Sequence, residues 1–256
     1  AIDWLKDMGY AYAFGPDIAF DGGSPERSDY QEALLLGRLR DAIARINRDL
    51  PEQAQEEALR KVMRLGKPSL LLNNHAFHHM LVNGIEVDYK TKDGRMVSGR
   101  ARLVDFENPD NNDWLVVNQY TVEASHQNGK VNRRPDVVIF INGLPLAVIE
   151  LKNASDEKAT IWSAFNQLQT YKHDIPALFD FNELLIISDG LNARIGSLTA
   201  NKEWFLPWKT IEGESTAPTS VTQLEVLLKG VFEKRRLLDL IRYFIVFEQE
   251  RGAPTL

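Results

Sequence analysis

Two carboxylates and a lysine stand on neighbouring apolar segments in the middle of the chain. Asp136 precedes the run VVIF, Glu150 lies near the end of the run LPLAVIEL, and Lys152 follows that run directly. Two carboxylates that share a face can hold a divalent cation, which binds a phosphate oxygen and lowers the pKa of a bound water. A nearby lysine ammonium can position or deprotonate that water. The three residues indicate metal-dependent chemistry on a phosphate; charges that merely begin and end strands are the alternative.

The turn between the two segments decides whether the carboxylates share a face. A two-residue type I′ turn at Asn142 and Gly143 would pair Asp136 with Ile149. Because side chains alternate along a strand, Glu150 would then point to the opposite face of the sheet. This register would separate the two carboxylates.

A bulged turn would bring the same carboxylates together. With Gly143 in a left-handed G1 bulge, Asp136 pairs with Val148. Asp136, Glu150 and Lys152 then lie on one face, with the backbones of the two carboxylates about 6 to 8 Å apart as diagonal neighbours. A single metal ion can bridge that span, and we predict this second register.

A polar pair follows on the next helical segment. In AFNQLQTYK, Gln167 and Tyr171 are four residues apart, so both project from one stripe of a helix. An amphipathic helix with an ordinary polar edge would show the same spacing. If the helix packs across the two apolar strands, the pair faces the carboxylates and the lysine.

The elements that must position these residues follow from the hydrophobic periodicity. Apolar residues recur at helical spacing in the first part of the chain and at every second position after Gly84. This order predicts a mixed, mostly antiparallel α/β sheet flanked by helices. Residues 1–28 read as a short helix, an extended aromatic piece and a loop. The other expected helices are 29–47, 51–65, 73–84, about 157–172 and 221–249, and the expected strands are a hairpin about Asp93 and Gly94 and the segments 101–106, 114–123, 137–140, 144–151 and 184–188.

Composition narrows the chemistry further. The chain has 256 residues, 44% hydrophobic and 26% charged, and no apolar run long enough to cross a bilayer, so we expect a cytoplasmic protein without a membrane contact. It has no cysteine, which leaves carboxylates, carbonyls and five histidines as metal ligands and favours hard cations such as Mg²⁺. Because the net charge is -6, any binding of nucleic acid must be confined to a local surface.

The spacing of the three charged residues matches a known signature. The pattern P-D-x(13)-E-x-K, formed by Asp136, Glu150 and Lys152, resembles the catalytic core of PD-(D/E)xK nucleases. The following Q-x-x-x-Y of Gln167 and Tyr171 is similar to the RecB-like branch of that superfamily. The resemblance implies a restriction-endonuclease-like fold.

Longer runs narrow the resemblance to one family. The segments LVVNQYTV, NRRPDVVIFINGLPLAVIELKN, ATIWSAFNQLQTYK and NELLIISDGLNARIGSLTA are similar to the amino-terminal nuclease domain of the R subunit of type I restriction endonucleases. The opening GYAYAFGPDIA and GRLRDAIARIN also resemble that family, so the likeness covers nearly the whole chain.

This resemblance implies a role for each site residue. Asp136 and Glu150 would ligate Mg²⁺, with the carbonyl of Leu151 as a further ligand, and Lys152 would be the catalytic lysine. The accessory residues at the cleavage site would be Gln167 and Tyr171. An acidic residue from an upstream helix completes related sites, and Glu32 is a candidate for it.

A basic cluster precedes the first carboxylate. Lys130, Arg133 and Arg134 lie within six residues of Asp136, where they suit contacts to DNA phosphates. A solvated loop is the alternative.

The resemblance also implies a larger assembly. Residues 1–220 would form the nuclease domain with an amino-terminal helical extension, and 221–256 would be a helical connector toward an ATP-dependent motor domain that this chain lacks. Alternatively, residues 221–256 complete the core of this same domain. The expected function is Mg²⁺-dependent DNA cleavage together with modification and specificity subunits; a catalytically inactive docking scaffold and a stand-alone repair nuclease are the alternatives.

Overall fold

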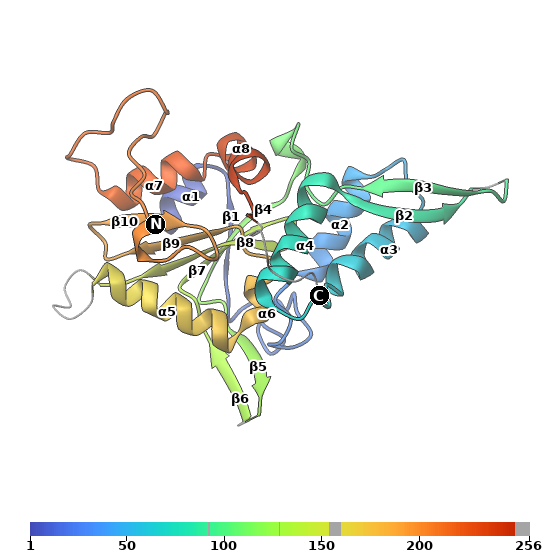
Figure 1. Ribbon diagram of the computed structural model, residues 1–256, viewed down its shortest axis with the longest axis horizontal. Coiled ribbons are helices and arrows are strands. Elements are labelled where there is room, and N and C mark those ends of the chain that lie inside the picture. The colour runs from blue at the N-terminus through green and yellow to red at the C-terminus, as the bar shows by residue number, and fades with distance from the viewer. Residues whose placement is uncertain (92, 128, 154–159, 249–256) are drawn as a thin grey trace.

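A six-stranded mixed sheet forms the centre of the protein in a computed structural model, which describes residues 1–91, 93–127, 129–153 and 160–248 (Figure 1). Two neighbouring pairs, β1 with β4 and β8 with β9, are parallel, and the other three are antiparallel. The predicted mixed, mostly antiparallel α/β sheet is confirmed. Across the sheet the strands are β1 (Ala11–Phe14), β4 (Trp114–Asn118), β7 (Val137–Ile141), β8 (Leu144–Leu151), β9 (Leu184–Ser188) and β10 (Ala193–Gly196).

Helices cover both faces of this sheet. In Figure 1, α5 lies on one side and packs on β8 and β9, while α1 and α7 lie on the other side. No helix in the described part of the chain is both long and apolar enough to cross a bilayer. The helices are α1 (Ile2–Asp7), α2 (Leu36–Ile46), α3 (Glu52–Met63), α4 (Leu70–Asn83), α5 (Ile161–Asp174), α6 (Pro176–Phe179), α7 (Gln223–Val231) and α8 (Lys234–Phe244), with short 3₁₀ turns at Pro109–Asn111 and Lys202–Trp204.

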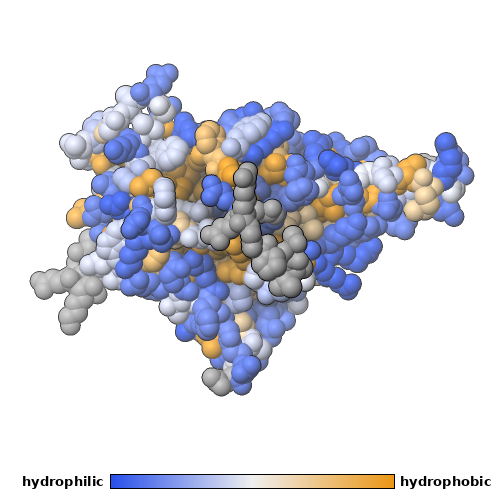
Figure 2. Space-filling model, viewed as in Figure 1, coloured by the Kyte–Doolittle hydropathy of each residue, from blue (hydrophilic) through white to orange (hydrophobic). Residues whose placement is uncertain are grey.

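Two hairpins project from the body of the molecule (Figure 1). One is β2 (Ile85–Lys90) with β3 (Met96–Ala101), which confirms the predicted hairpin about Asp93 and Gly94. The other is β5 (Val122–His126) with β6 (Gly129–Arg133), which leads directly into β7. Hydrophilic residues cover most of its surface in the view of Figure 2.

Several predicted element boundaries are wrong. The helix expected from residue 29 begins only at Leu36, because the Asp29 carboxylate accepts hydrogen bonds from the backbone N–H groups of Gln31 and Glu32 and holds a turn instead. The strand expected at 101–106 is wrong, because Ala101 is the last residue of β3 and residues 102–106 form no strand. The strand expected at 114–123 is divided between β4 and β5, which belong to different sheets. The expected start of α5 near Glu157 lies outside the described residues.

The carboxy-terminal segment forms two helices rather than one. The break comes before α8, where the Glu233 carboxylate caps the backbone N–H groups of Arg235 and Arg236. Most of the apolar residues of α7 and α8 join the core, whereas Phe244 is 73% exposed. These helices therefore complete the core of this domain in large part, and the boundary at residue 220 and the connector role stay predictions.

The turn between β7 and β8 has two residues. Asn142 and Gly143 have φ values of 55° and 78°, and Ile141 pairs with Leu144. The predicted G1 bulge at this turn is therefore wrong. Asn142 tolerates the left-handed conformation, and its buried side chain donates to Leu103 O and accepts from the N–H of Asp113.

A bulge farther along the hairpin restores the shared face. Ile139 pairs with Ala147 although Phe140 pairs with Pro145, so Leu146 is the extra residue of β8. Pro145 has no backbone N–H to donate, and proline within sheets is found at such bulges. The last pair in the hairpin register is Val137 with Ile149, which puts Asp136 directly opposite Glu150. The predicted pairing of Asp136 with Val148 is wrong, but the two carboxylates lie on one face.

We expect Gly143→Ala to destabilise the protein by at least about 2 kcal/mol, because it combines a strained φ with a steric clash. A Cβ atom at Gly143 would lie 2.4 Å from the carbonyl oxygen of Leu35, at the start of α2. Gly37→Ala is the matched control, since nothing lies within 4 Å of its Cβ position in α2, and it should stabilise by roughly 0.5 to 1 kcal/mol. Urea unfolding measures both, and equal stability of the two variants would contradict this account of the turn.

Candidate active site

Asp136 and Glu150 meet at one end of the β7–β8 hairpin. Asp136 directly precedes β7, and its Oδ2 accepts a hydrogen bond of 2.9 Å from the backbone N–H of Leu151. Glu150 lies one residue before the end of β8 and is 1% exposed. Glu150 is therefore buried inside the protein, whereas Asp136 is only partly buried.

Lys152 connects the carboxylates to α5. Its Nζ lies 2.9 Å from Glu150 Oε1 and also donates to Gln167 Oε1. The Gln167 side-chain amide in turn donates to the hydroxyl of Tyr171. The four side chains therefore form one chain of hydrogen bonds across the packing of α5 on β8, and the structure brings all the predicted catalytic residues together.

Burial sets the electrostatics of this site. The pKa of Glu150 is raised to about 7, because burial disfavours the carboxylate; the hydrogen bond from Lys152 opposes this shift and the nearby charge of Asp136 adds to it. Burial also raises the pKa of the Tyr171 hydroxyl to about 12, so this group is protonated at neutral pH. Of these two groups, Glu150 is the one whose pKa lies near neutral pH.

The donor set suits a hard divalent cation. Glu150 Oε2 is buried and has no hydrogen-bond partner in the described structure, which is unfavourable for a carboxylate oxygen unless something else satisfies it. Carboxylate oxygens are the ligands that Mg²⁺ prefers, and Mg²⁺ usually takes only one or two of them from the protein. The residues present therefore fit such an ion, although no group of three or more acidic or histidine residues within the described ranges converges on one point.

Glu32 does not join the two carboxylates in such a group. It lies in the loop before α2, where its carboxylate accepts hydrogen bonds of 2.7 Å and 2.6 Å from the backbone and hydroxyl of Ser28. The upstream acid suggested by the sequence is thus engaged in its own loop.

A cleft of about 780 Å³ opens beside the site. Its walls combine Asp136 with residues of α5, of β6 and of the β4–β5 and β6–β7 connections. The lining residues are Gln119, Thr121, Asn132, Arg133, Arg134, Asp136, Asn166, Gln167, Thr170 and Tyr171. Of the two carboxylates, Asp136 lines this cleft, together with residues of β6 and of α5.

The predicted basic residues are placed unequally around this cleft. Arg134 and Arg133 line it, but Arg133 is paired with Asp174 at 2.6 Å. Lys130 lies farther out on β6, where it pairs with Glu123 at 2.6 Å. Arg134 is exposed, and it is the cation of this cluster for which the structure records no acidic partner.

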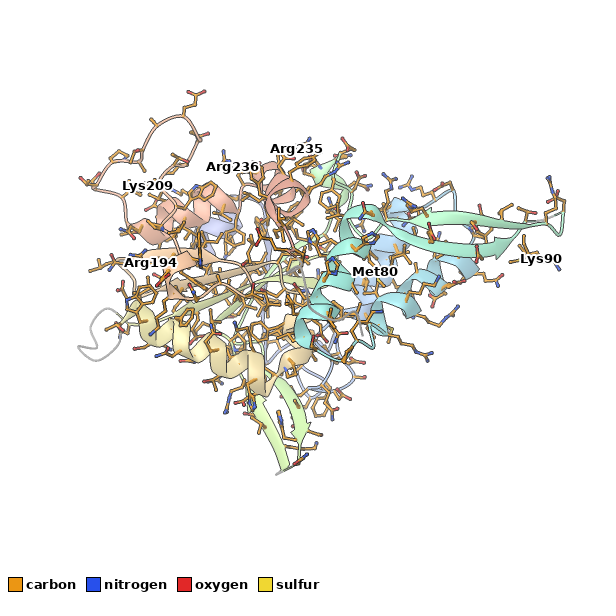
Figure 3. All side chains as sticks on the ribbon, in the orientation of Figure 1. Met80, Lys90, Arg194, Lys209, Arg235 and Arg236 are labelled. Atoms are coloured by element: carbon orange, nitrogen blue, oxygen red, sulfur yellow. The ribbon has the colours of Figure 1, made fainter. Side chains whose placement is uncertain are left out.

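Other cations serve the fold instead. Arg235 and Arg236 lie on the upper side of the molecule in Figure 3, away from the β5–β6 hairpin. Arg235 donates to the carbonyls of Phe106 and Glu107, and Arg236 donates to those of Ile211 and Gly230. These hydrogen bonds tie α8 to neighbouring loops.

Sequence reasoning missed Gln119. Its side-chain amide lies 3.3 Å from Asp136 Oδ1, and its backbone N–H donates to Asp136 O at 2.9 Å. Nothing in its residue type distinguishes it from other glutamines of the chain. Only the turn that it makes after β4 brings it to Asp136.

The fold and the site together define an α/β protein with two carboxylates and a lysine at the end of a central hairpin. The family model for the amino terminus of type I restriction enzyme R proteins matches residues 1–204. The chain therefore belongs to the family of type I restriction enzyme R protein N-terminal regions, as the sequence resemblance predicted.

Curated relatives agree with this family. The chain is 38% identical over 254 residues to the type I restriction enzyme HindI endonuclease subunit of Haemophilus influenzae, which covers 98% of this chain and 24% of that protein. It is 32% identical over 271 residues to a putative type I restriction enzyme endonuclease subunit, MjaIXP, of Methanocaldococcus jannaschii, covering 100% of this chain and 26% of that protein. The chain thus spans about a quarter of the length of these relatives.

Proposed function

We propose that this chain is the DNA-cleaving domain of the restriction subunit of a type I restriction-modification complex, and that it hydrolyses phosphodiester bonds with Mg²⁺. The observation that carries the proposal is the buried, unpartnered Oε2 of Glu150 beside Asp136 and Lys152. A buried carboxylate with a raised pKa and one free oxygen is costly for a fold, and cation binding offsets that cost.

In this proposal each site residue has a separate role. Asp136, Glu150 and the carbonyl of Leu151 would hold Mg²⁺, which when bound supplies charge to a phosphate oxygen and acidifies water. Lys152 presents its ammonium group to the same space, because Glu150 and Gln167 fix its Nζ from two sides. From there it orients the attacking water or the phosphate. Arg134 contacts the DNA backbone at the mouth of the cleft, and Arg133 and Lys130 contribute once DNA phosphates displace their acidic partners.

The alternative is a catalytically inactive scaffold that docks the motor and modification subunits. The net charge of -6 favours protein partners over a broad nucleic-acid surface. A scaffold, however, has no need of a buried carboxylate held beside a lysine, and this disfavours it.

The test is cleavage of a supercoiled plasmid that carries the target site. The complete complex with ATP and Mg²⁺ should nick and linearise the plasmid, and excess EDTA should abolish this, with the 256-residue chain assayed alone in parallel. A complex that hydrolyses ATP and binds DNA, but leaves the plasmid intact over a full range of Mg²⁺ and Mn²⁺ concentrations, would instead support the scaffold.

Gln167 and Tyr171 should have smaller effects than the three charged residues. Gln167→Ala removes one of the two groups that hold Lys152 Nζ, so we expect cleavage to fall roughly 10-fold, a loss typical of a residue that orients another. Tyr171→Phe keeps the ring packing and removes only the hydroxyl that binds Gln167, and should have a still smaller effect. Initial rates of plasmid nicking measure both, and wild-type rates in both variants would remove this pair from the site.

A further inference from the structure

Gln119 has a backbone conformation that its residue type does not favour. Its φ is 58°, and of the described non-glycine residues only Asn142 also has a positive φ. Asn142 occupies a hairpin turn that suits asparagine, whereas glutamine has no such preference. Residues held in this way cost stability, and they cluster at functional sites.

The neighbours of Gln119 enforce this conformation. The N–H of Gly15 donates to Asn118 O at 2.8 Å, and a Cβ atom on Gly15 would lie 2.3 Å from the carbonyl oxygen of Gln119. Only glycine therefore allows β1 to approach this turn so closely. On the other side Tyr120 is fully buried, and its hydroxyl donates to the carbonyl of Ala33. Gln119 is thus clamped between two anchored residues.

In this conformation Gln119 contacts Asp136 through both its backbone and its side chain. The Gln119 backbone N–H holds the carbonyl of Asp136 at 2.9 Å, and its side-chain amide approaches Asp136 Oδ1 at 3.3 Å. The Leu151 N–H takes the other carboxylate oxygen, Oδ2, at 2.9 Å. These two N–H groups, one on each oxygen, favour one orientation of the Asp136 carboxylate, although Asp136 lies before its strand begins and is only half buried.

From this geometry we infer that Gln119 is a positioning residue, which pre-orients the Asp136 carboxylate for a divalent cation. The inference rests on the proposed function and adds to it a residue outside the charged motif. Partners that orient a metal ligand typically contribute 10-fold to 100-fold in metal affinity. The strained turn after β4 is retained because it delivers the amide to Asp136.

The test measures Mn²⁺ binding to the full 256-residue chain without DNA, by calorimetry or electron paramagnetic resonance. Gln119→Gly removes the amide and relieves the strained φ, so it should weaken Mn²⁺ binding about 10-fold or more while the melting temperature does not fall. Gln31→Gly is the matched control, an exposed glutamine in the loop before α2, and should bind Mn²⁺ as the wild type does.

Two further variants separate the possible outcomes. Gln119→Asn suits the left-handed conformation but is one methylene shorter, so it should stay folded and also bind Mn²⁺ more weakly. Wild-type binding by folded Gln119→Gly or Gln119→Asn would overturn the inference. Asp136→Asn tests the proposed function itself: if it loses binding while the Gln119 variants do not, only the positioning role fails, and if the wild type binds no Mn²⁺, both fail.

Discussion

Asp136→Asn, Glu150→Gln and Lys152→Ala, each made in the complete restriction subunit, are expected to lower DNA cleavage by about 100-fold or more, the range seen when one group that stabilises a transition state is removed. The first two variants keep the shape of the side chain and remove the negative charge that a metal requires. The third removes the ammonium that lies between Glu150 and Gln167. Under the proposed function ATP hydrolysis should stay near the wild-type rate, because none of the three residues would belong to the ATP-dependent motor.

The matched control is Asp110→Asn, the same chemical change at an exposed carboxylate outside the cleft. It should leave both cleavage and ATP hydrolysis unchanged. Full cutting by any of the three site variants would exclude its residue from the chemistry. Loss of ATP hydrolysis together with cutting in all three would show that they serve folding or assembly instead.

The second large effect concerns stability and pH. Without metal, the pKa of Glu150 is about 7 in the folded protein and near its ordinary value of 4.5 in the unfolded chain. Because the folded value is the higher one, the associated stability is fully present below about pH 4.5 and is lost as the pH rises through 7. The shift corresponds to a loss on the order of 3 kcal/mol.

Glu150→Gln should remove this pH dependence. In EDTA at pH 8 the variant should be more stable than the wild type, and near pH 4.5 the difference should vanish; the pKa values of Asp180 and Glu183 are also raised by burial, but both residues are common to the two proteins. Mg²⁺ should raise the melting temperature of the wild type at pH 8 and leave that of the variant unchanged. Urea unfolding across this pH range is the measurement, and parallel stability curves for the two proteins would contradict a buried, metal-seeking Glu150.

The candidate site residues could be selected from the sequence because charges on apolar strands stand out against their surroundings. Strand assignment and spacing singled out Asp136, Glu150 and Lys152, the resemblance gave them roles, and the structure places them close together. The register of the hairpin could not be predicted in the same way. Two turns fit the residues Asn142 and Gly143, and the bulge that decides the outcome lies away from the turn, next to Pro145.

Other features depend on contacts between distant segments. Gln119 reaches Asp136 because β1 and β4 pair in parallel and Gly15 packs against its peptide, and no local pattern records that approach. The helix expected from residue 29 starts late for a local reason that competes with helical periodicity, the backbone hydrogen bonds of Asp29. Periodicity thus predicted most helices and the central strands, but it missed β6 and β10 and placed a strand at 101–106 that does not form. It also placed several element ends wrongly, as at Asp29, where a polar side chain binds the backbone.

The most direct test of the account is a crystal of this chain soaked in Mn²⁺ at about pH 8, with an anomalous difference map collected at the manganese edge. We expect a peak within ligand distance of a carboxylate oxygen of Asp136 and of Glu150 Oε2, the buried oxygen that has no hydrogen-bond partner. The same soak of Glu150→Gln should show no peak there. A map without manganese between these two carboxylates at millimolar Mn²⁺, or with an unchanged peak in the variant, would contradict a metal-dependent site at Asp136 and Glu150.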